Sequence, residues 1–224
     1  MMNYLFKTFL ILISFSAFSF SDSNQVMDCH DSSVNSRCLL FIGDVFPTQF
    51  NIGQIVTHRR VERIHHHNQR GRLDAYLAAR VAPLVWGPGN RFFIIDRHHL
   101  SYALLNSQLA VEKKYLRAYI KKDWRHFSED TFWKKMQNHQ WAYLKDKGSK
   151  RHWSELPPLD QLGDDPHRSL IWLAIRRDVI DKPNDARPFF EFYIADQIRE
   201  HIHLNGAQTF EDLEVFLPKL ERHL

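Results

Sequence analysis

The sequence has little cysteine, little glycine and no apolar run long enough to span a membrane comfortably. Its 224 residues contain two cysteines, Cys29 and Cys38, whose spacing does not match a tetrahedral zinc site. The eight glycines and nine prolines follow no period, and neither an internal repeat nor a low-complexity tract is present. The apolar segment 8–18 is shorter than the ~20 residues of a transmembrane helix. These absences argue against a zinc-centred fold, a repeat protein and a transmembrane span.

The first 21 residues have the composition of a secretory signal peptide. Lys7 lies in a short N-terminal region, the apolar core follows it, and Ser19 and Ser21 supply small residues at the exit. We expect cleavage after Ser19 or after Ser21, which gives a secreted or periplasmic mature chain with no stable membrane span. An uncleaved membrane anchor and a buried helix are the alternatives, and the short apolar core disfavours the anchor.

Composition and charge suit one packed domain. Hydrophobic residues make up 44% of the chain and aromatic residues 13%, which is enough for a sizeable core. The formal charge of +4 and the pI near 9.1 permit contact with nucleic acid or other phosphates without requiring it. In the segment 22–45, an even cysteine count in an oxidising compartment indicates a Cys29–Cys38 disulfide, and two free thiols are the alternative.

Ionisable residues gather within the segment 92–105, FFIIDRHHLSYALL. An apolar run with β-strand character ends in Asp96, Arg97, His98 and His99, and the apolar spacing that follows predicts a helix. Such a junction aims the first free backbone N–H groups of the helix and the positive end of its dipole at one point, which favours an anion such as phosphate. We therefore expect any chemistry of this protein at this junction.

A purely structural role for this cluster is the alternative. Asp96 has the position of an N-cap that accepts a hydrogen bond from the backbone N–H of His98 or His99, and the histidines would then be first-turn surface residues. The flanking sequence favours the functional interpretation. Residues 83–86 and 91–95, joined by a Gly-Pro-Gly-Asn turn, predict a β-hairpin whose second strand delivers the cluster.

With this order of hairpin, D-x-H-H and helix, the chain resembles the ParB/sulfiredoxin superfamily and, within it, the branch of ParB-like nucleases. The resemblance runs from about Phe46 to about His203 and includes further blocks in one order. These blocks are PTQFNIG (47–53), FWKKMQ (132–137), WAYLKD (141–146), ELPPL (155–159), DDPHRSL (164–170) and PFFEFYIADQIR (188–199). The resemblance implies an α+β fold with a small mixed β-sheet and flanking helices at 46–127, and a helical C-terminal part of the same domain at 128–224.

The resemblance also shows where this chain departs from its relatives. In the superfamily, the junction that matches Asp96 to Leu100 cradles nucleotide phosphates, and free-serine kinases carry it as D-G-H-H-R. Here Arg97 occupies the glycine position and Leu100 the terminal arginine position. Those kinases place a carboxylate base in a P-x-E context, whereas this chain has Gln49, which cannot abstract a proton. A kinase mechanism therefore lacks its base unless Asp44 or Glu62 substitutes.

Hydrophobic periodicity predicts the remaining elements. Strands are predicted at 39–45 and 115–120, and helices at 53–67, 73–80, 131–137, 189–204 and 209–220. The helix at 53–67 is polar and basic, and its three terminal histidines point in different directions, which favours a solvated helix end over a metal site. The apolar stripe of the helix at 131–137 favours core packing over base stacking.

A second charged junction, Asp164 to Ser169, precedes the apolar run LIWLAI. Asp165 before Pro166 predicts an N-cap with proline at the first helical position. Arg168 on the first turn makes this helix start a second candidate anion site, and an Asp–Arg pair that holds the loop is the alternative. In the helix at 189–204, Glu191 is a weak metal candidate, and helix packing with a solvated polar side is favoured.

The sequence predicts an exported ParB-like protein that binds a phosphate-bearing ligand at the Asp96–His99 junction. If the protein is an enzyme, the predicted reaction is hydrolysis of phosphodiester bonds. In a nuclease, His98 or His99 would act as general base or acid, Asp96 would orient an imidazole, and Arg97 with the helix N–H groups would stabilise the transition state. The further predicted phosphate contacts are Ser101 and Arg168, and the secondary candidates are Gln49, Asp164, Asp165 and Glu191.

Cofactor and partner are predicted only by class. A divalent cation, if one takes part, would have Asp96, one of the two histidines and Asp164 as ligands. A nucleotide is the other candidate cofactor, and nucleic acid or a nucleotide the candidate partner, while the oligomeric state is left open. The competing functions are a non-catalytic ligand-binding or host-interaction module and a nucleotide-dependent phosphotransferase.

Overall fold

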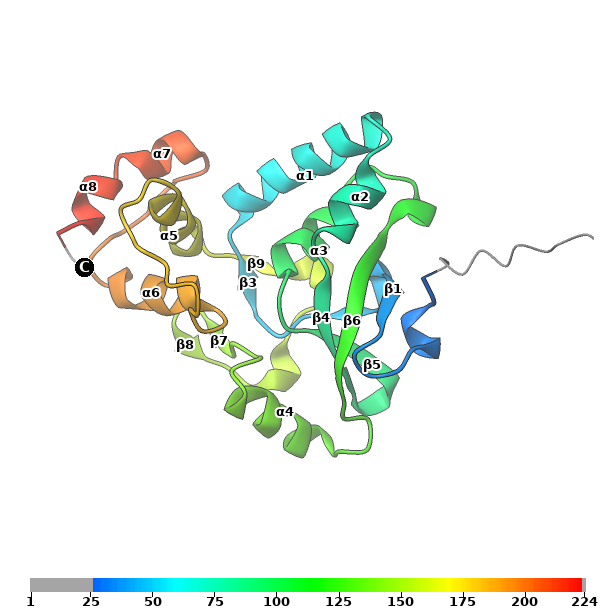
Figure 1. Ribbon diagram of the computed structural model, residues 1–224. Coiled ribbons are helices and arrows are strands. Elements are labelled where there is room, and N and C mark those ends of the chain that lie inside the picture. The colour runs from blue at the N-terminus through cyan, green and yellow to red at the C-terminus, as the bar shows by residue number, and fades with distance from the viewer. Residues whose placement is uncertain (1–25, 223–224) are drawn as a thin grey trace, which may run out of the picture.

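The computed structural model describes residues 26–222, so the predicted signal peptide lies outside the described residues. Its chain forms a mixed β-sheet with helices on both faces, followed by a group of short helices packed against one end of α1 (Figure 1). The predicted α+β class is confirmed.

A five-stranded sheet has the order β1-β6-β4-β5-β2. Its strands are β1 (Arg37–Phe41), β2 (Val45–Phe46), β4 (Ala82–Gly87), β5 (Arg91–Ile94) and β6 (Tyr115–Asp123). Strand β6 pairs antiparallel with β1 and parallel with β4, and β2 runs parallel to β5. The predicted hairpin is present as the antiparallel pair β4–β5. The sheet includes β1, so it begins before residue 46, where the resemblance placed the start of the α/β core.

The side chains of each strand alternate between the two faces of the sheet, and different helices cover these faces. Leu84 and Ile94 belong to a core shared with α1 (Gln54–Gln69), α2 (Leu73–Ala78) and α3 (His98–Leu105). On the other face, Phe93 packs with Phe132 and Trp133 of α4 (Glu129–Asn138). The apolar stripe of α4 therefore forms core, as its spacing predicted.

The C-terminal helices form a third core of their own. They are α5 (Pro166–Arg176), α6 (Phe190–Ile198), α7 (Phe210–Glu214) and α8 (Leu217–Leu220). Ile55 and Val56, in the first turn of α1, are part of this core and join it to the sheet. The parallel pair of β3 (Asn51–Ile52) and β9 (Gly163–Asp164) makes a second connection between the two parts of the chain.

The remaining regular structure consists of short turns and one small hairpin. Strands β7 (Lys145–Asp146) and β8 (Ser149–Lys150) form that hairpin beside α6. The 3-10 turns are Cys29–Asp31, Ile42–Asp44, Pro88–Asn90, Val111–Lys113, Trp153–Glu155 and Leu159–Gln161. The first of these is joined to β1 by a disulfide between Cys29 and Cys38, whose side chains are fully buried.

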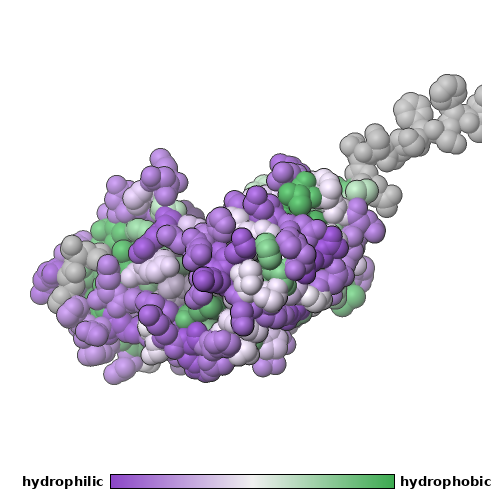
Figure 2. Space-filling view, turned by 90° about the horizontal axis from the view of Figure 1, so that it is seen from below, coloured by the Kyte–Doolittle hydropathy of each residue, from purple (hydrophilic) through white to green (hydrophobic). Residues whose placement is uncertain are grey.

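The surface seen from below is mainly hydrophilic, with apolar residues in separate groups (Figure 2). Among residues 26–222, no helix has both the length and the apolar character that a membrane crossing requires.

Candidate functional site

A cavity of about 440 Å³ opens where β5 passes into α3, opposite the start of α5 and the segment that leads into α6. Two carboxylates line it, Asp96 and Glu191. They are outnumbered by the six cations of the lining, which are Arg60, Arg97, Lys121, Arg168, Lys182 and Arg187. The cavity therefore carries an excess of positive charge, and a bound anion would be favoured in it.

The predicted strand-to-helix junction forms one wall of this cavity. Arg97 is the residue before the first turn of α3 and adopts a left-handed backbone conformation (φ 74°, ψ 17°). The backbone N–H groups of His98, His99 and Leu100 belong to the first turn and have no intrahelical carbonyl to bond. They lie at the positive end of the helix dipole, as the sequence predicted.

Asp96 does not cap α3 in the predicted way. Its Oδ1 accepts a hydrogen bond from the backbone N–H of Arg97 at 2.6 Å, and its side chain is 63% exposed. The interpretation of Asp96 as an N-cap bonded to His98 or His99 is therefore wrong, because Arg97 takes the capping position with a left-handed turn. The carboxylate of Asp96 is left exposed at the mouth of the cavity.

His98 is buried and fixes the segment that follows β2. Its Nε2 accepts a hydrogen bond from the backbone N–H of Thr48 (3.2 Å), while the Thr48 hydroxyl donates to the Ile94 carbonyl (2.8 Å). Burial lowers the pKa of His98 to about 4, and the charge of Asp96 and the Ile94 carbonyl oppose only part of this shift. His98 is therefore a neutral ring with its proton on Nδ1 at neutral pH.

His99, the next residue of α3, makes an equivalent contact with the residue that precedes α1. Its Nε2 accepts a hydrogen bond from the backbone N–H of Gly53 at 3.0 Å. Burial lowers the pKa of His99 well below its usual range, and the positive charges of Arg168 and Arg60 lower it further. Both histidines thus hold residues 48–53 against α3, and neither lies on the solvent-exposed turn that the structural alternative assumed.

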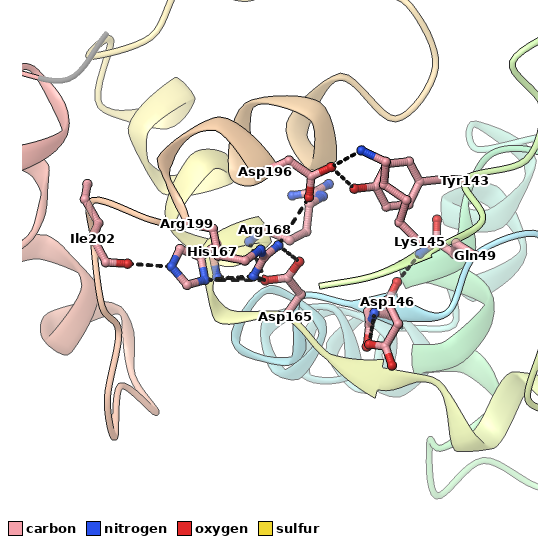
Figure 3. A network of polar contacts seen from close by, with 11 residues as sticks. Gln49, Tyr143, Lys145, Asp146, Asp165, His167, Arg168, Asp196, Arg199 and Ile202 are labelled. Carbon is pink, nitrogen blue, oxygen red and sulfur yellow. Dashed lines mark hydrogen bonds and ion pairs between the residues drawn. The ribbon is translucent and has the colours of Figure 1, made fainter. Parts of the chain in front are cut away.

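The start of α5 forms the opposite wall and is held by a buried polar network (Figure 3). Asp165 is the N-cap and accepts hydrogen bonds from the backbone N–H groups of His167 and Arg168. Arg199, the C-cap residue of α6, binds both carboxylate oxygens of Asp165, at 3.1 and 2.8 Å. Burial alone would raise the pKa of Asp165, but the hydrogen bonds from His167 and Arg199 lower it to about 2. The predicted N-cap is confirmed, and its ion-pair partner is Arg199.

Further bonds join this network to the β7 region. The ring of His167 donates from Nε2 to the Ile202 carbonyl (2.6 Å), since its Nδ1 accepts from Arg199 (3.1 Å). On the adjoining turn of α6, Asp196 accepts hydrogen bonds from the hydroxyl of Tyr143 (2.6 Å) and from the ammonium of Lys145 (2.8 Å). Burial and the bond to Asp196 raise the pKa of Tyr143. These bonds fix α5 and α6 relative to the sheet.

Arg168 has an incomplete set of partners. Its side chain is 9% exposed and lines the cavity, and its Nη2 lies 3.7 Å from Oε1 of Glu191, which is too long for a hydrogen bond. Its Nε and Nη1 have no hydrogen-bond partner within residues 26–222. Burying a guanidinium whose Nε and Nη1 lack hydrogen-bond partners in the protein is energetically costly.

Two other side chains complete this part of the cavity. Glu191 also binds Lys182 at 2.9 Å, and although burial would raise the pKa of Glu191, the charges of Arg168 and Lys182 lower it to about 2. Arg60 of α1 lines the cavity with a buried Nε that lacks a hydrogen-bond partner in the described part of the chain. Burial lowers the pKa of Arg60, and the charges of Arg168, Arg97 and Arg63 add to this effect.

The structure brings most, but not all, of the predicted site residues together. Gln49 lines the cavity and donates from its side-chain amide to the Asn51 carbonyl. Ser101 does not line it, because its hydroxyl donates to the Arg97 carbonyl (3.1 Å). Asp164 lies beside the start of α1, and its Oδ1 accepts a hydrogen bond from the backbone N–H of Gln54 (2.8 Å). In residues 26–222, no group of three or more His, Cys, Asp or Glu side chains is placed to hold a metal ion.

The cations that other elements contribute to the cavity are harder to predict from the sequence. Arg60 had a signal, because it lies four residues from both Val56 and Ile64 and so occupies a position in the apolar stripe of α1. No comparable sequence signal marks Lys121, Lys182 and Arg187, because a strand and an irregular segment supply them from distant parts of the sequence.

Comparison with known proteins identifies the fold and then the family. The chain is similar to the crystal structure of protein Atu1540 from Agrobacterium tumefaciens, with 25% sequence identity and a TM-score of 0.63 over 83% of this chain and 90% of that chain. Residues 38–200 match the family described as "Putative ParB-like nuclease". The chain therefore belongs to this family, and the predicted relationship is confirmed. No curated protein matches the chain.

Proposed function

We propose that this protein binds a phosphate-bearing ligand in the cavity between the start of α3 and the start of α5. The observation that carries the proposal is Arg168, a buried guanidinium with two unused donors at the wall of a positively charged cavity. A phosphate offers charged oxygens to such donors and to the free N–H groups of α3 at the same time. Ligand binding would complete the hydrogen bonding that the free protein leaves unfinished.

The family supplies the class of ligand. Its description as a ParB-like nuclease supports a nucleic acid or a nucleotide as the phosphate-bearing ligand. The cavity also presents aromatic rings beside its cations, among them Trp141 and Phe189, and such rings suit a nucleobase. Thus both the charge and the apolar parts of the cavity are compatible with a nucleotide unit.

Phosphodiester hydrolysis is a second candidate, supported by the family description. Arg97 and Arg168 would stabilise charge on a phosphoryl group, and the exposed carboxylate of Asp96 would accept a proton or contribute to binding a divalent cation. His98 and His99 hold the chain through Nε2, so a role as general base would require breaking a backbone hydrogen bond. In this proposal each histidine either donates a hydrogen bond from its Nδ1–H or only holds α3 in position.

Export is the remaining part of the proposal. The Cys29–Cys38 disulfide supports it, because such bonds persist in oxidising compartments. Mass spectrometry of the secreted or periplasmic fraction tests it: a mature N-terminus at residue 20 or 22 is expected, and an intact Met1 on the cell-associated protein would contradict export.

Binding is tested by calorimetric titration with inorganic phosphate and with mononucleotides. Arg168→Met should weaken binding about tenfold to a hundredfold, since each charge-assisted hydrogen bond contributes about 1.5–3 kcal/mol. Arg176→Met is the matched control, because Arg176 is an exposed arginine on the same helix and should bind as the wild type does. Equal binding by wild type and Arg168→Met would refute the proposed site.

Hydrolysis is tested separately with single-stranded and double-stranded substrates, with and without divalent cations. Asp96→Asn preserves the shape of an exposed side chain, so the fold and the phosphate affinity should change little. If Asp96 takes part in the chemistry, turnover should fall by two or more orders of magnitude. Tight binding without any turnover by the wild type would favour the non-catalytic alternative.

A further inference from the structure

The positive charge of the protein is concentrated in α1 and α2. Residues 54–80 contain six arginines and two acidic residues, so they carry a formal charge of +4, which equals that of the whole chain. One of the two acids, Asp74, is bound by Arg117 of β6. The rest of the molecule is formally neutral, and its charges are balanced.

Three of these arginines and His66 form one stripe on the exposed side of α1. Arg59, Arg63, His66 and the C-cap residue Arg70 are spaced by four, three and four residues, which places them on one face of the helix. All four residues are exposed, and no ion pair within residues 26–222 involves Arg59, Arg63 or Arg70. The stripe is about 16 Å long at 1.5 Å per residue.

The stripe begins beside the cavity. Arg60 of α1 lines the cavity, and Arg63, one turn further along, is close enough for its charge to act on Arg60. The charges of Arg168 and Arg97 act on Arg60 as well. Positive charge therefore extends from the start of α5, through Arg60, to the outer face of α1. The helix α1 itself runs from beside α5 toward α2 (Figure 1).

We infer that the α1 stripe, defined by Arg59, Arg63, His66 and Arg70, binds the backbone of a nucleic-acid strand whose terminal or target phosphate occupies the cavity. This inference rests on the proposed function of the cavity. A phosphate in the cavity neutralises Arg168 and Arg60, and the neighbouring phosphates of the strand then follow the unpaired arginines of α1. At the spacing of about 3.4 Å between phosphates along one strand of a stacked helix, a length of 16 Å spans about four to five phosphates. The ligand is accordingly a polymer, for which the cavity alone is too small.

The test compares a labelled single-stranded oligonucleotide of about 15 nucleotides with a mononucleotide as ligands of the protein. The triple variant Arg59→Gln, Arg63→Gln, Arg70→Gln should bind the oligonucleotide about tenfold to a hundredfold more weakly. The slope of log affinity against log salt should fall by about 2, because each lost contact with a single strand contributes about 0.7. Binding of the mononucleotide should be unchanged, since the cavity is intact.

A control variant separates the stripe from general charge. The control removes three exposed cations from α4, β8 and α8 by changing Lys134, Lys150 and Lys219 to Gln. Its slope of log affinity against log salt should equal that of the wild type within error. If the control and the stripe variant lose affinity equally, or if the stripe variant keeps the wild-type slope, the inference is wrong. If the stripe inference is wrong but Arg168→Met loses mononucleotide binding, the proposed cavity site is still supported. The two proposals can therefore fail independently.

Discussion

Arg97 adopts a backbone conformation that glycine takes without strain. The relatives that carry D-G-H-H place glycine at this position, and this chain replaces it with a cation at the mouth of the cavity. The left-handed conformation costs a non-glycine residue about 1 kcal/mol, so Arg97 carries a conformational penalty that glycine would not. This is expected of a residue that contacts a ligand.

Two substitutions of Arg97 separate conformation from charge. Arg97→Ala should be about 1 kcal/mol less stable than Arg97→Gly, because alanine keeps the left-handed penalty that glycine lacks. Both variants should bind inorganic phosphate more weakly and to the same extent, since both lose the guanidinium. Urea unfolding and calorimetry measure the two effects. Retention of wild-type phosphate affinity by either variant would show that the guanidinium does not contact the ligand.

At the scale of elements, the junction depends on close contact between α1 and α5. Gly53 precedes α1, and an added Cβ would meet the hydroxyl and the backbone of Ser169 in α5. The same Gly53 N–H bonds to His99 of α3. One glycine therefore allows three helices to approach, which is a positional requirement that the D-x-H-H pattern does not reveal.

Gly53→Ala should destabilise the fold by about 1–3 kcal/mol through overpacking. A second change, Ser169→Ala, removes the hydroxyl from the contact and should recover part of this loss. Gly71→Ala, at an exposed turn with open space around its Cα, serves as the comparison for glycine removal where only backbone strain applies. Additive effects of Gly53→Ala and Ser169→Ala in a double-mutant cycle would contradict a direct contact.

The elements themselves could be predicted from the sequence because local patterns determine them. The apolar run in 91–95 predicted β5, and Asp165 with Pro166 predicted the start of α5. Helix α6 is shorter than predicted, Phe190–Ile198, because the chain leaves the helix after Ile198 and Ile202 joins the C-terminal core. In the site, the junction itself was predicted, whereas the roles of Arg60 and Arg199 depend on tertiary neighbours and could not be.

At the scale of the whole molecule, the buried histidines couple stability to pH. His98 is neutral in the native and unfolded states above pH 6.5. As the pH falls below 6.5 the unfolded chain takes up a proton, while the native ring does not until about pH 4. The unfolded state thus binds more protons in this window, and the free energy of unfolding falls as the pH falls.

Between pH 7 and pH 5, His98 should contribute a loss of about 2 kcal/mol to the free energy of unfolding. His98→Gln keeps an acceptor for the Thr48 N–H but cannot titrate, so its stability should vary less with pH by about this amount. Urea unfolding at the two pH values measures the difference. An identical pH dependence of His98→Gln and wild type would show that the native ring is not held neutral.

The order of the sheet has a consequence for how the protein comes to be folded. Strands β1 and β2 are the first in sequence, yet they occupy the two edges, and β6, β4 and β5 lie between them. A chain that emerges from its N-terminus cannot pair β1 until residues 115–119 have followed, because within residues 26–222 β6 is the one strand beside β1 in the sheet. The β4–β5 hairpin, with its short connection, is the first pairing that can form. The first strand of the chain is thus among the last to join the sheet, although it lies closest to the N-terminus.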